Sequence, residues 1–142
     1  MPYASVDQLK AVIPSGDLAL LTDFDGAETP SDARLEQALD DASAEINTYI
    51  AKVVSLPIAE TPHILTVVCR DLAMHRLYMN LGHGSEVYEA LRRDAIATLK
   101  SIAKGETAIG DDGDGDSALT SPGVAMTDGP DRLFTRKSLK GF

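Results

Sequence analysis

The feature that most constrains the fold is a helical spacing of apolar residues, which recurs in three segments separated by proline and glycine. In the first segment, apolar residues recur at intervals of three and four, which places them on one face of a helix. We expect this helix to run from about Asp32 to Val54, with Ser31 as its N-cap and Leu56-Pro57 beyond its end. The expected buried stripe consists of Leu35, Leu39, Ala42, Ile46, Tyr49, Ile50 and Val53.

The second segment is predicted to be the central, most buried helix. Thr61-Pro62 resembles an N-cap followed by an N1 proline, the helix runs to about Asn80, and Gly82-His83-Gly84 ends it. Its apolar residues surround most of the helix, which is typical of a helix covered on several sides. They are Ile64, Leu65, Val67, Val68, Cys69, Leu72, Ala73, Leu77 and Tyr78.

The third segment, Glu86 to Lys104, begins after Ser85 as N-cap and ends with Gly105 at the C′ position. Its expected stripe is Val87, Leu91, Ala95, Leu99, Ile102 and Ala103.

The first thirty residues add short helices to these three. Near the N-terminus, Ser5 and Gln8 have the spacing of a capping box and open a short helix that Pro14 and Gly16 end. Asp17 to Leu21 forms one more turn in this interpretation. We therefore expect an all-α fold: a bundle of four to five helices with an extended acidic loop and an extended C-terminal tail. We leave open a short β-hairpin within that loop, around Ala108-Ile109 and Val124-Ala125.

The distribution of charge divides the chain into three parts. Residues 1–105, the predicted helical bundle, carry 9 basic and 15 acidic side chains. Residues 106–131 carry seven acidic side chains and no basic one, and are rich in glycine and aspartate. Residues 132–142 carry four basic side chains and no acidic one. The overall net charge of −9 argues against a basic face for binding nucleic acid.

The C-terminal tail is the strongest candidate for a binding segment. Its apolar and cationic residues alternate outside any amphipathic helix, so we assign partner binding to Leu133, Phe134, Arg136, Lys137, Leu139, Lys140 and Phe142. Burying the four apolar side chains is worth ~6–12 kcal/mol, and ordering some ten residues costs about as much. A single tail would bind weakly, and several tails in a ring would bind firmly. The alternative is a tail that folds back on its own bundle.

Asp112, Asp114 and Asp116 alternate in the acidic loop as in a calcium loop. An EF-hand needs a glutamate at its twelfth position, and counting from Asp112 that position is Gly123. We therefore predict no metal site. Copies of Asp111, Asp112, Asp114 and Asp116 around a ring would instead line a channel with negative charge, past which DNA slides without binding.

No catalytic set is recognisable. The single cysteine, Cys69, falls on a buried stripe and has no histidine at metal-ligand spacing. We expect no enzymatic activity and no cofactor.

The carboxylates Asp40, Asp41 and Glu45 are expected on the solvent side of the helix over 32–54. Arginines of a neighbouring copy, among them Arg76 and Arg92, could meet them there. No apolar run is long enough to span a membrane, and nothing resembles a signal peptide.

Four stretches give the chain a resemblance to a family of Mu-like phage and prophage proteins encoded in the virion structural gene block. They are MPYASVDQLK, the Leu21-Thr22-Asp23 turn with ARLEQALDDASAEINTYIAK, CRDLAMHRLYMN after Pro57 and Pro62, and VYEALRRDAIATLKSIAKGE with the ending FTRKSLKGF. The chain departs from the family at Val53-Val54-Ser55, where many relatives have Arg-Tyr.

The resemblance implies a helical adaptor of the head–tail connector, which forms a ring, twelve-fold by analogy, beneath the portal. Its partners would be other copies of itself, the portal protein and the next neck or tail-completion protein, with DNA passing nearby. Its location would be the virion neck, and the host cytoplasm before assembly. A small acidic regulatory module such as a DNA mimic is the alternative, although a mimic spreads its carboxylates over the folded surface and here they concentrate in one loop.

Overall fold

The computed structural model describes residues 1–22, 31–82 and 84–109, and within these ranges every regular element is an α-helix. The five helices are α1 (Val6–Lys10), α2 (Ser15–Thr22), α3 (Asp32–Ile50), α4 (His63–Asn80) and α5 (Glu86–Ala103). The prediction of an all-α bundle of four to five helices is confirmed. No helix in the described ranges is long and apolar enough to cross a membrane.

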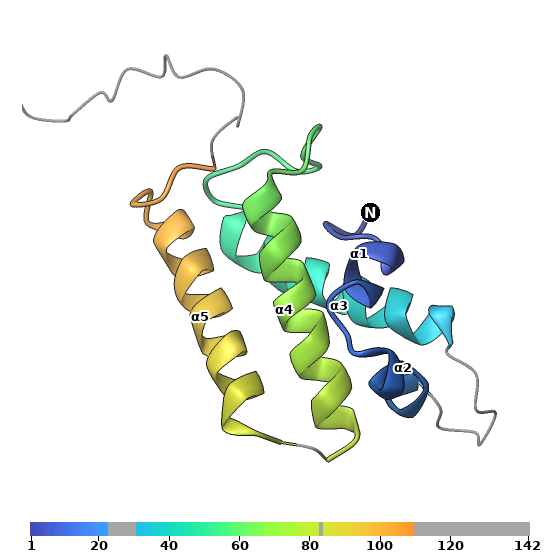
Figure 1. Ribbon diagram of the computed structural model, residues 1–142. Coiled ribbons are helices and arrows are strands. Elements are labelled where there is room, and N and C mark those ends of the chain that lie inside the picture. The colour runs from blue at the N-terminus through green and yellow to red at the C-terminus, as the bar shows by residue number, and fades with distance from the viewer. Residues whose placement is uncertain (23–30, 83, 110–142) are drawn as a thin grey trace, which may run out of the picture. The chain divides into compact units, whose positions relative to one another are not determined.

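The helix α4 is the centre of the bundle. It packs against each of the other four helices, and Figure 1 shows it beside α5, with α3 crossing behind it and α1 and α2 on its other side. Leu65, Cys69, Leu72, Ala73 and Leu77 are almost completely buried along its length. The apolar residues around α4 therefore reflect cover from several directions, as the sequence predicted.

Most of the helix ends lie where the local sequence predicted them. The Ser5 hydroxyl accepts a hydrogen bond from the Gln8 backbone N–H, and the Gln8 side chain accepts one from the Ser5 N–H, which completes the capping box of α1. Asn80 ends α4 as expected. Gly82 and Gly105 follow α4 and α5 at positive φ, +72° and +75°, a conformation that glycine adopts without steric cost.

Three expected boundaries were wrong. Gly16 lies inside α2, because Pro14 precedes the first turn of that helix and its carbonyl accepts the N–H groups of Asp17 and Leu18. Pro62 occupies the N-cap of α4, not N1. The helix α3 ends at Ile50, four residues early, and Val53, in the connection that follows it, is 47% exposed.

The predicted stripe of α5 is confirmed at Ala95, Leu99 and Ile102, and it is wrong at its first residue. Val87 is 66% exposed, whereas Ile96, which the stripe omitted, is buried. Figure 1 shows α5 at the outer side of the bundle, and its main contacts among the described helices are with α4 and α3. Its contact face is therefore set by two neighbours, and Ile96 belongs to it.

The segment before α1 is held in the groove between α3 and α4 by polar contacts. The Tyr3 backbone N–H donates to Ser43 Oγ at 3.0 Å, and the Tyr3 carbonyl accepts from Thr66 Oγ1 at 3.0 Å. The Tyr3 hydroxyl donates to Asn47 Oδ1. Ser43 Oγ also lies 3.4 Å from Cys69 Sγ, so the buried polar groups of this region satisfy one another.

Candidate assembly surfaces

The residues that the sequence marks for partner binding lie outside the described part of the chain. These are the tail residues Leu133, Phe134, Arg136, Lys137, Leu139, Lys140 and Phe142, and the loop residues Asp111, Asp112, Asp114 and Asp116. From residue 110 onward, the loop and tail segments over 106–131 and 132–142 lie in the same undescribed range, and so does Val124-Ala125 of the hairpin left open. Its other half, Ala108-Ile109, is described and forms no strand. The assignments in the undescribed range remain predictions.

Within the described residues, large apolar side chains are exposed at both ends of α4. At its beginning, in the connection from α3, Val53 and Leu56 are 47% and 39% exposed. At its end, beside the turn into α5, Met79 and Val87 are 41% and 66% exposed. We call these pairs the 53/56 patch and the 79/87 patch. Leu20 on α2 and Val12 before it are also exposed. Exposed apolar side chains that gather at one place are typical of contact surfaces.

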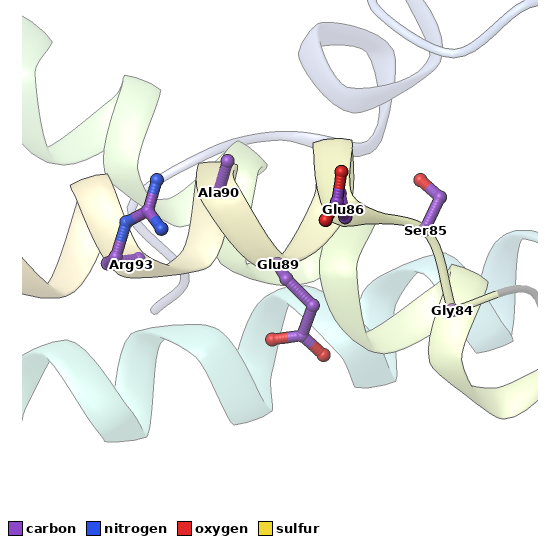
Figure 2. Close-up of a pocket in the computed structure, with 6 residues that line it drawn as sticks. All are labelled: Gly84, Ser85, Glu86, Glu89, Ala90 and Arg93. Carbon is purple, nitrogen blue, oxygen red and sulfur yellow. The ribbon is translucent and has the colours of Figure 1, made fainter.

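A depression lies at the start of α5, in the same part of the chain as the 79/87 patch. It has a volume of about 630 Å³ and is lined by Gly84, Ser85, Glu86, Glu89, Ala90 and Arg93. Figure 2 shows the carboxylates of Glu86 and Glu89 projecting in different directions from the first turns of α5, with Arg93 one turn further along the helix. Met79 borders it, because its Sδ would lie 3.7 Å from a Cβ at Gly84.

The aromatic pair Tyr78 and Tyr88 joins the two helices that carry this depression. The rings stack with centroids 3.8 Å apart and planes 14° from parallel. The Tyr78 hydroxyl donates to Asp17 Oδ2 at 2.8 Å, which also ties α4 to α2. Burial and these two neighbours raise the pKa of Tyr78 far above its ordinary value, so the hydroxyl stays protonated and remains a donor. The depression is therefore built on fixed elements.

The strongest electrostatic feature is a carboxylate shared by two arginines. Glu45 on α3 accepts hydrogen bonds from Arg76 on α4 and Arg92 on α5, each at 2.8 Å, and its side chain is only 17% exposed. We expected Glu45 to be solvated and Arg76 and Arg92 to meet carboxylates of a neighbouring copy. Both expectations were wrong for these three residues. The three groups form hydrogen bonds within one chain, since α3, α4 and α5 pack together, while the buried Arg76 Nε has no hydrogen-bond partner among the described residues. Asp40 and Asp41 are exposed, as predicted.

The titratable residues do not form a metal site within the described ranges. There, no group of three or more histidine, cysteine, aspartate or glutamate side chains could hold a metal ion. His63 is exposed, and His75 Nε2 lies 3.5 Å from Glu89 Oε1. Cys69 is a free, buried thiol whose pKa is raised by desolvation, so it is neither a ready nucleophile nor a ready ligand.

Comparison with known proteins identifies relatives of nearly full length. The family described as "Bacteriophage Mu, Gp36" matches residues 3–128. Gene product J of Escherichia phage Mu is 32% identical over 143 aligned residues, covering 100% of this chain and 99% of that protein. The Mu-like prophage FluMu protein gp36 of Haemophilus influenzae is 27% identical over 116 residues, covering 82% of this chain and 80% of that protein.

Proposed function

Because the chain belongs to the bacteriophage Mu Gp36 family, we propose that it is a structural subunit of the phage head–tail connector, an adaptor ring between portal and tail. In this proposal the protein is not an enzyme. It works by assembling with copies of itself, with the portal protein and with the next neck or tail-completion protein. It resides in the virion neck, and DNA passes the ring without being bound specifically.

The observation that carries the proposal is the exposure of large apolar side chains at both ends of the central helix. The 53/56 patch and the 79/87 patch lie at opposite ends of α4, an 18-residue helix, about 27 Å apart along its axis. A subunit with contact surfaces at two distant places can bind one neighbour at each, and repetition of such a contact closes into a ring. A small binding module that acts alone needs only one such surface.

The sequence of the tail supports the same proposal. Residues 132–142 combine two phenylalanines and two leucines with four cations, and the described residues of α1 to α5 form a hydrophobic core among themselves. A segment of this composition suits an attachment site on a neighbouring subunit or on the portal. The acidic loop over 106–131 would face the DNA path, where phosphate repels carboxylate.

The proposal is tested in the phage that encodes the chain, with its own copy of the gene disrupted and tagged variants supplied from a plasmid. We expect the full chain to restore tailed particles and to be found in purified virions by mass spectrometry. Deletion of Thr135–Phe142 should leave helix content and thermal unfolding unchanged while abolishing incorporation. Ser138→Ala, which keeps every apolar and cationic group of the tail, serves as the matched control.

Absence of the full chain from restored virions would overturn the structural role, and normal incorporation of the deletion would overturn the role of the tail. A native mass measurement with and without the portal protein then gives the number of copies. We expect a complex of about twelve copies in the presence of the portal, and a strictly monomeric protein under both conditions would contradict the ring.

A further inference from the structure

The 79/87 patch differs from the other exposed apolar surfaces in its charge. Glu86 and Glu89 lie on the first turns of α5, on either side of Val87 in the sequence, and Arg93, which also lines the depression, has its Nε 3.8 Å from Asp94 Oδ1. The residues that line the depression thus carry two carboxylates and one guanidinium, so their formal charge is negative. Glu89 Oε1 also lies 3.5 Å from His75 Nε2. At the 53/56 patch, the depression lined by residues 51–56 contains Lys52 and no carboxylate.

The C-terminal tail has the complementary pattern. Its four apolar residues alternate with Arg132, Arg136, Lys137 and Lys140, and it contains no acidic side chain. Phenylalanine and leucine suit the exposed Met79 and Val87, since thioether sulfur and aromatic rings make favourable contacts. The cations suit the carboxylates at the start of α5.

The geometry of the chain allows the tail to reach such a surface. The described chain ends at Ile109, whose side chain packs against the core near the end of α5. The depression at the start of α5 is therefore about one helix length away, roughly 27 Å. The residues between Ile109 and Phe134 can span up to ~80 Å, which is enough to pass from one copy to the next in a ring.

We propose that the depression at the start of α5, together with Met79 and Val87, is the docking site for the C-terminal tail, residues 132–142, of a neighbouring copy. The proposal rests on the ring of the proposed function, because a tail bound to its own bundle would leave neighbouring copies unlinked. Each copy then offers one tail and one site, so the contact is head-to-tail and continues around the ring. The Tyr78–Tyr88 stack holds the site in place before the tail arrives.

The test is a disulfide cross-link between the site and the tail in the full-length chain, both purified and assembled in particles. The doubly substituted chain Val87→Cys with Leu139→Cys is oxidised and run on a non-reducing gel. The native Cys69 is buried and does not compete. Docking onto a neighbour predicts a ladder of covalent multimers. The matched control pairs Leu139→Cys with Val53→Cys, which is also exposed but lies in the 53/56 patch, and should give at least tenfold less ladder.

Charge reversal makes the test specific. Glu86→Lys with Glu89→Lys should reduce the ladder at least tenfold, and adding Arg136→Glu with Lys137→Glu to the same chain should restore it. A fast-migrating, internally closed monomer in place of the ladder would overturn docking onto a neighbour. Three results would overturn the docking site. The ladder could be absent both from particles and from the purified protein, or it could be equally strong when Val53→Cys replaces Val87→Cys. It could also be insensitive to charge reversal.

The connector role and the docking site can be contradicted independently of each other. A ladder formed by a chain that never enters virions would keep the docking site and contradict the connector role. A chain that enters virions normally without forming the ladder would keep the connector role and contradict the docking site.

Discussion

Glu45 is the single residue whose environment departs most from what its position in the sequence indicates. It lies on the long helix α3 near two exposed carboxylates, yet it holds arginines from two other helices at 2.8 Å. Arg76 and Arg92 are each roughly two-fifths exposed, so water screens part of the interaction. Removing it therefore lowers the free energy of unfolding by much less than breaking a fully buried ion pair does.

Glu45→Gln should therefore lower the free energy of unfolding by about 1–2 kcal/mol, the range for hydrogen bonds to charged groups after screening. Asp41→Asn is the matched control, because Asp41 is exposed on the same helix and accepts a hydrogen bond from the Gln37 amide. It should change stability by less than about 0.5 kcal/mol. Urea denaturation measures both, and equal effects would contradict the assignment of Glu45.

Cys69 carries a prediction about alkaline pH. Burial raises the pKa of its thiol above the ordinary value of 9.0, with smaller opposing effects from Ser43 and the backbone of Tyr3 and Ala4. The unfolded chain therefore loses this proton at a lower pH than the folded chain does. The associated stability is fully present below about pH 9, the pKa of an exposed thiol, and is lost as pH rises through the folded value.

Raising the pH from 8 to 10 should thus lower the urea midpoint of the wild type more than that of Cys69→Ala. Tyr3 and Tyr78, whose pKa values burial also raises, remain in both proteins and provide the common background. A thiol reagent should label Cys69 only at urea concentrations that unfold the chain. Equal pH dependence in the two proteins, or rapid labelling in native buffer, would show that the thiol is not protected.

At the scale of a single helix, the two serine N-caps of α1 and α5 differ in what their side chains do. Ser5 forms both hydrogen bonds of a capping box, whereas Ser85 makes no side-chain capping bond. Ser5→Ala should cost about 1 kcal/mol of unfolding free energy, because α1 packs on α3 and α4 and unfolds with them. Ser85→Ala should cost close to nothing. Thermal unfolding of the two variants side by side makes the comparison, and a larger loss for Ser85→Ala would reverse the assignment.

Two glycines give opposite predictions for the same substitution. Gly105 ends α5 at φ +75°, where a Cβ is strained, and Gly16 lies within α2 with no atom within 4 Å of an added Cβ. Gly105→Ala should destabilise the protein by about 1 kcal/mol. Gly16→Ala should stabilise it by about 0.5–1 kcal/mol, since alanine loses less backbone freedom in a helix. Chemical denaturation of both variants is the measurement, and shifts of the same sign would contradict it.

At the scale of the whole molecule, the charge of the acidic loop has a predicted consequence for DNA movement. If Asp111, Asp112, Asp114 and Asp116 line the channel of the ring, changing all four to Asn should slow DNA ejection, because phosphates lose the repulsion that keeps them off the wall. A time course of DNA release from purified particles measures this. Neutralising Asp7, Glu36, Asp40 and Asp41, all exposed on the bundle, removes the same charge elsewhere and should leave ejection unchanged. Equal rates of DNA release from wild-type particles, from particles with the loop variant and from particles with the bundle variant would contradict a channel-lining loop.

The sequence alone determined those features that depend on neighbours along the chain. The capping box at Ser5, the end of α4 at Asn80 and the glycine stop at Gly105 follow from hydrogen bonds and backbone preferences within a few residues. The central position of α4 was also predictable, because apolar residues around most of a helix require cover on several sides. The family was recognisable for the same reason: its motifs are read along the chain.

Only the tertiary structure decided which groups meet across helices. Periodicity defines a face of a helix, but the neighbours set its width and rotation, so Val87 is exposed, Ile96 is buried and α3 ends at Ile50. Glu45 could not be matched to Arg76 and Arg92, 31 and 47 residues away, nor Tyr3 to Ser43 and Thr66. Such pairs depend on how three helices pack together, which no local pattern encodes, and the surface at the start of α5 arises from the same packing.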